Sequence, residues 1–200
     1  MKAVARVCFS ATLLAVLASV SDAAAEPQAN AGLTLGGAAV GPAGEAWDHG
    51  EFHLGLRGDT LFGRDDAFDF GIGPYAEIGT MAFDELQFGG GASLLLPVHA
   101  SLPLVASVGA FGRVGDDDYG VEPGFSGALF WGSRSYNFHA NYVMTVGLSV
   151  GYRQTFGQAD ESALLIAAQL DLAALGLPLV ALINVLRGPT AEAAPLGEDD

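Results

Sequence analysis

Charged side chains and one histidine recur at alternate positions in segments that are otherwise apolar or rich in glycine. The set contains both signs and comes from well-separated parts of the chain: His53, Arg57, Asp59, Asp69, Glu77, Arg113, Glu122, Arg153 and Asp171. Charges that are removed from water must pair, because an isolated buried charge is very costly. We therefore expect an interlocked cluster of ion pairs. The alternative is a polar track for a small solute or a proton.

The acidic run Asp116, Asp117 and Asp118 could offer oxygen ligands to Ca²⁺ or Mg²⁺. Three consecutive acids point in different directions, however, and no calcium-loop spacing follows them, so a solvated acidic loop is the better interpretation. The chain also has no phosphate-binding glycine loop, zinc pattern or dinucleotide fingerprint. We predict neither a metal ion nor a cofactor.

The elements that carry these side chains are predicted to be β-strands. In residues 145–156 hydrophobic side chains alternate with Gly, Ser, Arg and Thr, which is the period of a strand with two different faces. The same alternation recurs in residues 33–40, 52–59, 68–79, 86–96, 104–113, 121–131 and 164–172. Pro74 predicts an irregularity in the third of these strands, because proline donates no ladder hydrogen bond. Residues 132–141 give no clear assignment.

About eight strands of this length suit a membrane-spanning barrel, in which roughly 9–11 residues cross the bilayer at a tilt. A soluble β-protein could also alternate, but its solvent faces usually carry Lys, Thr and Glu. Here the polar faces are rich in glycine, which suits the crowded interior of a narrow barrel. We therefore predict an all-β fold, an antiparallel up-and-down transmembrane β-barrel of about eight strands.

The first 25 residues have the features of a secretory signal peptide. Lys2 and Arg6 precede a largely apolar stretch, and Ala23 to Ala25 form a small-residue cleavage site. The run is short and interrupted for a spanning helix, which disfavours a permanent anchor. The only cysteine, Cys8, lies within this segment, so the mature chain is expected to have no disulfide and no thiol chemistry.

The mature chain is acidic and contains no lysine. It has 6 arginines against 22 Asp and Glu residues, a net charge of −16, which argues against nucleic acid as a partner. Half of the whole chain is hydrophobic and 28 residues are glycine, so disorder does not explain the composition. We expect outer-membrane lipid as the main partner and a monomeric protein.

The pattern in residues 33–172 resembles the small eight-stranded outer-membrane barrels of Gram-negative bacteria, with OmpA/OmpX-like architecture. The resemblance rests on the repeated alternation, not on a signature motif. It implies residence in the bacterial outer membrane and a structural or surface-interaction role with a closed lumen, and a narrow pore is the alternative. Barrels of this class usually end on an aromatic residue that the assembly machinery reads, whereas this chain ends PTAEAAPLGEDD.

The resemblance also brings two enzyme classes into view, the lipid A deacylases and the lipid A palmitoyltransferases. Both use a histidine with a serine and an acidic or amide partner. Here His49 lies beside Asp48, and His139 follows Ser133 and Ser135. The deacylase pattern would have Ser where Ala140 stands, so we predict no enzymatic activity.

The C-terminal part departs most from this class. Residues 176–200 begin with an apolar stretch in which Pro178 suits the start of a helix, and Gly188 with Pro189 suits its end. A helix that is apolar on every side must be buried in protein or lipid. We predict a barrel in residues 26–175, followed by a short apolar helix and an acidic, disordered tail.

Overall fold

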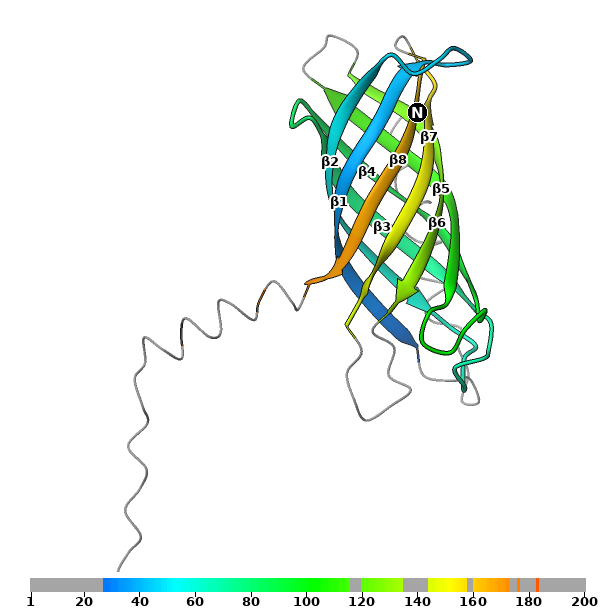
Figure 1. Cartoon of the computed structure of the whole chain (residues 1–200). Helices are drawn as coiled ribbons and strands as arrows, with labels where there is room; N and C mark the ends of the chain where they lie inside the picture. The colour runs from blue at the N-terminus through cyan, green and yellow to red at the C-terminus, as the bar shows by residue number, and fades with distance from the viewer. Residues whose placement is uncertain are drawn as a thin grey trace, which may run out of the picture.

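The computed structural model describes residues 27–115, 120–134, 144–157 and 160–172, together with Gly176 and Ile183. These residues form eight strands in chain order (Figure 1). Their bounds are β1 (Gln28–Pro42), β2 (His49–Leu61), β3 (Gly71–Met81), β4 (Glu85–Leu96), β5 (Leu104–Gly115), β6 (Val121–Ser133), β7 (Val146–Thr155) and β8 (Glu161–Asp171). Among the described residues, no helix is long and apolar enough to cross a membrane.

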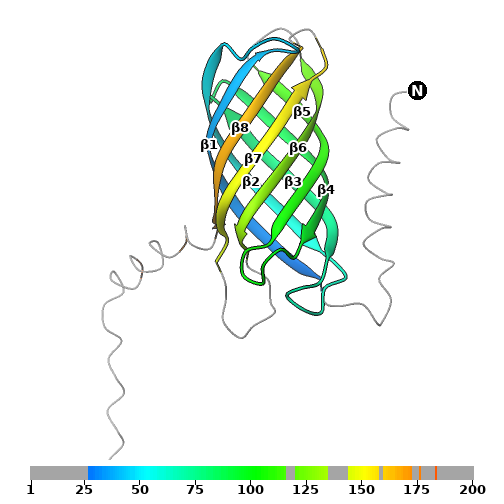
Figure 2. The ribbon, with the colours of Figure 1, turned by 45° about the vertical axis from the view of Figure 1, so that its right-hand side comes forward.

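The strands form one closed barrel with up-and-down topology (Figure 2). Each strand pairs antiparallel with the next along the chain, and β1 pairs antiparallel with β8 to close the sheet. Closure leaves no unpaired sheet edge. The predicted fold class and the predicted number of strands are confirmed.

The outer face of the barrel is apolar on all eight strands. Each strand carries at least one large hydrophobic side chain that is exposed, and Val108 (64%), Ile78 (49%) and Leu148 (58%) are examples. The pairing registers and the two-residue period place every charged residue of the strands on the inner face. The barrel is thus apolar outside and polar inside, which is the reverse of a soluble protein.

The lumen is narrow, and glycine makes that possible. A Cβ atom on Gly36 of β1 would lie 2.5 Å from the Cα of Ala167 on β8, and one on Gly109 would lie 2.5 Å from the Tyr75 hydroxyl oxygen. A residue with a Cβ atom at either position would therefore force the neighbouring atoms to shift. The glycine-rich strand faces therefore point into a space that other side chains fill.

Three details differ from the predicted strands. β1 begins at Gln28, five residues earlier than the predicted strand of residues 33–40, and β3 begins at Gly71, three residues later than the predicted strand of residues 68–79. The β2–β3 ladder stops after Asp59 and Tyr75 and resumes only at one bridge between Phe62 and Ile72. Pro74 lies in this gap, as expected, but the register is the same on both sides, so the interruption is not a bulge.

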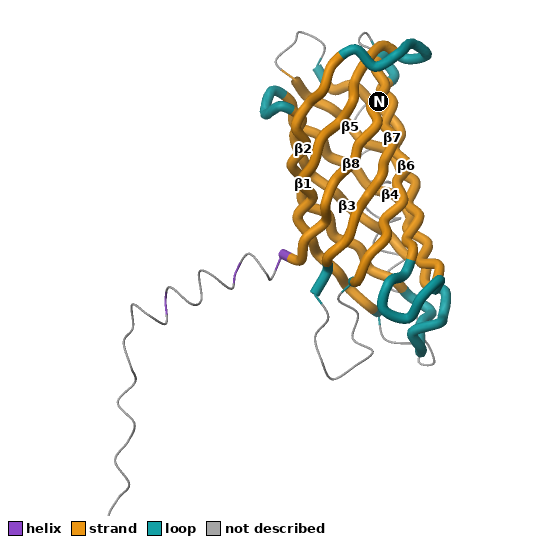
Figure 3. The backbone as a smooth tube through the Cα atoms, in the orientation of Figure 1, coloured by secondary structure: helices purple, strands orange, loops and turns teal. Residues whose placement is uncertain are grey.

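The connections at the two ends of the barrel differ in length (Figure 3). At one end, here called the short-loop end, the strands are joined by residues 43–48, 82–84, 116–120 and 156–160. At the other end, the terminus end, β1 begins, β8 ends, and residues 62–70, 97–103 and 134–145 join the strands. The predicted C-terminal helix and acidic tail lie outside the described residues, apart from Gly176 and Ile183.

Candidate functional site

The structure brings most of the predicted charges together inside the barrel. Eight of the nine occupy inward-facing strand positions: His53, Arg57, Asp59, Glu77, Arg113, Glu122, Arg153 and Asp171. They come from β2, β3, β5, β6, β7 and β8, so they line opposite walls of the lumen.

Asp69 is the exception and does not enter the lumen. It lies in the connection before β3, where its carboxylate accepts hydrogen bonds from the backbone N–H groups of Asp65 (2.9 Å) and Asp66 (2.7 Å). Aspartate commonly organises a turn in this way. The alternation in residues 68–79 suggests a strand face for Asp69, but the ladder begins only at Gly71, so the first part of that pattern belongs to the turn.

The middle of the lumen holds a chain of ion pairs with alternating sign, here called the central network. Arg134 pairs with Asp59, whose other neighbour is Arg57 at 3.8 Å. Arg57 continues to Glu77 at 3.6 Å, and Glu77 accepts a hydrogen bond from Arg153 at 2.9 Å. The side chains are at most 15% exposed, so solvent screens these pairs only weakly.

Hydroxyl groups and aromatic rings complete the surroundings of Arg57. Its Nη2 atom donates to Ser93 (3.0 Å) and Ser107 (2.5 Å), and its guanidinium group lies over the ring of Tyr75 at 3.9 Å. The Tyr75 hydroxyl in turn lies 3.1 Å from that of Ser126. A guanidinium group fixed on several sides is a rigid element, because few rotamers satisfy all of these contacts.

A second group, here called the mouth cluster, lies toward the short-loop end. Arg113 on β5 pairs with Glu122 (2.8 Å), with Glu85 (3.2 Å) and with Glu161 of β8. The pair with Glu161 crosses the lumen, since β5 and β8 are not neighbours in the barrel. One arginine thus holds three carboxylates, and this end of the lumen is acidic.

Two arginines of the lumen were not among the predicted site residues. Arg64, in the β2–β3 connection, donates to the Gln28 side chain (3.0 Å) and to the carbonyl oxygens of Asp69 and Ala67. Arg134 follows the last residue of β6 and pairs with Asp59. The even-numbered residues of β6 face inward, and Arg134 is the next residue in that series, so the alternation in the sequence could have identified it. Arg64 lies in a turn, where alternation assigns no face.

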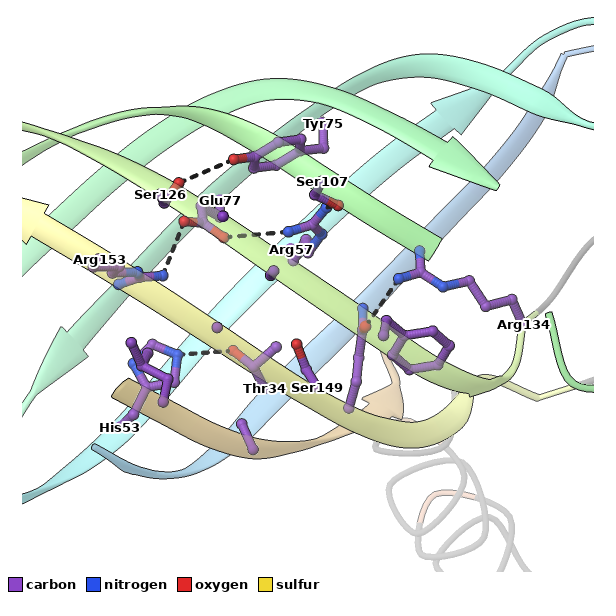
Figure 4. A pocket seen from close by; sticks show the side chains of 17 residues that line it. Thr34, His53, Arg57, Tyr75, Glu77, Ser107, Ser126, Arg134, Ser149 and Arg153 are labelled. Carbon is purple, nitrogen blue, oxygen red and sulfur yellow. Dashed lines mark hydrogen bonds and ion pairs between the residues drawn. The ribbon is translucent and has the colours of Figure 1, made fainter. Parts of the chain in front are cut away.

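Small cavities interrupt the packing along the lumen. The central one, about 50 Å³, is surrounded by Arg57, Glu77, Arg134, Arg153 and several hydroxyl side chains (Figure 4). A smaller cavity of about 20 Å³ borders the mouth cluster, and Arg153 lines both. Buried apolar clusters lie toward both ends, Leu61, Leu95, Val105 and Phe130 at one and Ala38, Val40, Met81, Ala163 and Leu165 at the other.

The candidate catalytic residues do not assemble where the structure describes them. His49, the first residue of β2, contacts the carboxylates of Asp48 (2.5 Å) and Glu51 (3.1 Å) at the short-loop end. The hydroxyl of Ser133 donates to the carbonyl oxygen of Met144 (2.5 Å) at the opposite end of the barrel. Ser135, His139 and Ala140 lie outside the described residues, as do Asp116, Asp117 and Asp118.

The described part of the chain contains no group of three or more His, Cys, Asp or Glu side chains arranged to hold a metal ion. The carboxylates of the mouth cluster are engaged by Arg113 instead. What the lumen can do chemically is hold charges of both signs in fixed positions and offer hydrogen-bond donors to a small guest.

Aromatic side chains collect on the outside near the short-loop end. Phe125 lies against Tyr152 and Phe156, with ring centroids 5.9 and 5.7 Å apart, and Phe52 stacks on Phe83 at 5.5 Å. Trp131 is 56% exposed near the terminus end. Aromatic rings at these two levels suit the two interfaces of a bilayer.

No protein-family model matches the chain, and no curated protein matches its sequence. Among solved structures, the chain is similar to the outer membrane protein Ail of Yersinia pestis in a bilayer nanodisc, with a TM-score of 0.37, 12% identity, and coverage of 72% of this chain and 99% of that one. It is also similar to Ail crystallised with the heparin analogue sucrose octasulfate, with a TM-score of 0.41, 10% identity, and coverage of 73% and 99%. Likeness this distant supports no conclusion about ligand or activity.

Proposed function

We propose that the protein is a structural component of the bacterial outer membrane, with a barrel that is closed in its resting state. The observation that carries the proposal is the segregation of charge: all charged strand residues face inward, while large hydrophobic side chains are exposed on every strand. An exposed apolar surface that encircles a molecule must be covered, and lipid covers all sides of a barrel at once. The predicted signal peptide supplies a route of export.

The short connections favour a structural role over one based on large surface loops. With an even number of strands, both ends of the chain lie on the same side, which is the periplasm in this class of barrel. The outer side then carries only residues 43–48, 82–84, 116–120 and 156–160. Such connections present little surface to a partner outside the cell, and the scaffold itself is the more substantial feature.

Membrane residence is tested by extraction and by gel mobility. The protein should remain with the outer-membrane fraction, need detergent for purification, and migrate differently before and after heating, as folded barrels do. A protein that stays in the soluble fraction without detergent would contradict the proposal. Lipid A from cells with and without the gene should have the same mass spectrum, because we propose no enzymatic activity.

A narrow pore is the second candidate, and the row of cavities favours it. Three cavities, of about 50, 10 and 20 Å³, follow one another along the lumen, and Arg153 lines all three. Arg153 is therefore in contact with every cavity of this row. In planar bilayers, silence of the wild-type protein supports the closed scaffold, whereas discrete openings support the pore.

A further inference from the structure

A groove of about 280 Å³ crosses the outer face of β1, β2 and β3 toward the terminus end. Its floor is formed by Ala31, Gly58 and Ala76, which are paired with one another across the three strands. Leu56 and Ile78, both exposed, form its wall on the side of the short-loop end. The groove is therefore apolar and opens away from the lumen.

The groove lies beside the end of the last strand. The β1–β8 ladder ends where Asp171 meets Gly32, whereas β1 extends further, to Gln28. Leu172, the residue after β8, borders the groove and is 43% exposed. The segment that continues the chain from Leu172 therefore begins at the edge of this apolar surface.

This segment is a long apolar stretch. Residues 172–186 contain no charged side chain, and Asn184 is the only polar side chain among them. A Cβ atom on Gly176 would meet no atom within 4 Å, and Ile183 is 38% exposed, so these two described residues of the stretch do not fill the groove. Within the described part of the chain, the groove is left uncovered.

The length and composition of the stretch disfavour three other locations. A helix from Pro178 to Arg187 would be about 15 Å long, half of the roughly 30 Å needed to cross the hydrocarbon core. A helix that lies in the membrane interface has a charged or polar face, which this stretch lacks. The lumen is filled by side chains, whereas a helix is about 10 Å wide. The outer wall beside Leu172 offers protein on one side of the helix and lipid on the other.

We propose that residues 178–187 form a helix that docks in the groove over β1, β2 and β3 of the same barrel. The linker of residues 173–177 spans at most about 18 Å, and the groove begins at Leu172, so the helix can reach it. Adjacent strands are about 4.8 Å apart, so a helix of about 15 Å crosses all three. Small residues in the floor let the helix backbone approach closely, as they do at helix contacts within membranes.

The short linker favours the protein's own groove over that of a neighbouring copy, because it keeps the helix at a high effective concentration. The inference rests on the proposed membrane residence, which fractionation tests separately. The mature chain is also suited to cross-linking, since its only cysteine, Cys8, lies in the predicted signal peptide. Introduced cysteine pairs therefore report proximity without a background.

The test is disulfide formation in membranes on oxidation with copper phenanthroline. Ala181→Cys, Leu182→Cys and Ile183→Cys are introduced one at a time, because successive helix residues point about 100° apart and one of the three must face the groove. Each is combined with Leu56→Cys on β2 or with the control Leu129→Cys on β6, leucines that are 43% and 51% exposed on opposite walls. At least one should join Leu56→Cys within a single chain, several-fold more than Leu129→Cys.

A second pair of variants tests the groove itself. A Cβ atom at Gly58 would lie 3.7 Å from the carbonyl oxygen of Asn30, and one at Gly127 would lie 3.8 Å from that of Ser107, so both positions accept a side chain. Gly58→Leu fills the floor of the groove and should reduce the cross-link several-fold. Gly127→Leu, on the outer face of β6, should leave it unchanged.

Each protein must first show the heat-dependent gel shift of a folded barrel. If Gly58→Leu does not fold, the cysteine pairs in the otherwise unaltered chain still decide the matter. The proposal is overturned if no cysteine at residues 181–183 prefers Leu56→Cys to Leu129→Cys, which would mean that lipid covers the groove. It is also overturned if the cross-links join two chains, which would make a second copy the occupant, or if Gly58→Leu cross-links like the unaltered barrel.

Discussion

Arg153 on β7 and Glu77 on β3 face one another across the lumen, with a hydrogen bond of 2.9 Å between them. The two strands lie four positions apart in a closed ring of eight, so this contact joins opposite walls of the barrel. Glu77 also has Arg57 at 3.6 Å, and the Nη1 atom of Arg153 also bonds to Gln87. The carboxylate of Glu77 on β3 therefore connects β3 to β2 and to β7. β2 is a neighbour of β3 in the sheet, whereas β7 shares no ladder hydrogen bonds with either strand.

Replacing Glu77 by alanine should destabilise the barrel strongly. The change leaves Arg57 and Arg153 without their shared carboxylate, and breaking a buried pair from one side costs about 3–5 kcal/mol. Because Glu77 remains 15% exposed, we expect the lower end of this range, about 3 kcal/mol. The measurement is the urea-unfolding free energy in detergent micelles.

Two further variants assign that loss to the ion pair. The double variant of Glu77→Ala and Arg153→Ala should lose less than the sum of the single variants, since the second change removes a charge that the first left unpaired. Glu45→Ala, in the exposed connection of residues 43–48, should leave the free energy of unfolding unchanged. Strict additivity of Glu77 and Arg153 would mean that water solvates both groups.

An arginine substituted on the outer face should destabilise the barrel most where that face lies deepest in the bilayer. Val108 and Val121 are matched in type and exposure, at 64% and 62%, but Val108 lies within β5 whereas Val121 begins β6 at the short-loop end. In lipid bilayers, Val108→Arg should cost about 2–4 kcal/mol and Val121→Arg about 0–1 kcal/mol, because the cost falls toward the interface. Equal effects would contradict a lipid-facing position for β5.

The strands could be predicted from the sequence because lipid and lumen impose opposite requirements on successive residues. A shift of one residue reverses every side chain, so the alternation in residues 145–156 closely determines β7 (Val146–Thr155). The same rule places Arg57, Glu77 and Arg153 on the inner face. It fails for Asp69, since a turn can continue the alternation of a strand for a few residues without joining the ladder.

The pairing inside the lumen could not be predicted in the same way. Which charges meet across the barrel depends on strand tilt and stagger, which the sequence of a single strand does not contain. Glu77 and Arg153 are 76 residues apart, and Arg134 and Asp59 are 75 apart. Arg134 could have been recognised as one more inward position after β6, whereas Arg64 gives no periodic signal at all.

The apolar stretch after β8 should matter for assembly, while the acidic end should not. Deleting residues 189–200 removes a segment predicted to be solvated, so the protein should reach the membrane and keep its heat-dependent gel mobility. Deleting residues 178–200 also removes the predicted apolar helix, which must be buried in protein or lipid, and should lower the yield of folded barrel. Equal tolerance of both deletions would show that the apolar stretch does not contribute to the fold.

Two general rules for outer-membrane barrels predict opposite orientations of this barrel in the membrane. In this class of barrel both chain ends lie in the periplasm, and the longer connections usually lie outside the cell. Here the longer connections, 62–70 and 134–145, are at the terminus end, so one of the two regularities must fail. We expect the position of the termini to prevail, because it follows from the even number of strands and from the side on which assembly begins.

An epitope tag between Asp117 and Asp118, in the β5–β6 connection, should therefore be detected on intact cells. The matched insertion between His99 and Ala100, in the β4–β5 connection, should be detected only after the outer membrane is permeabilised. Each tagged protein must first show the mobility shift of a folded barrel, so that access reports topology and not unfolding. The reverse pattern would place the termini and the longer connections on the cell surface. It would also support a role in surface interaction, since residues 62–70 and 97–103 would then be available to partners outside the cell.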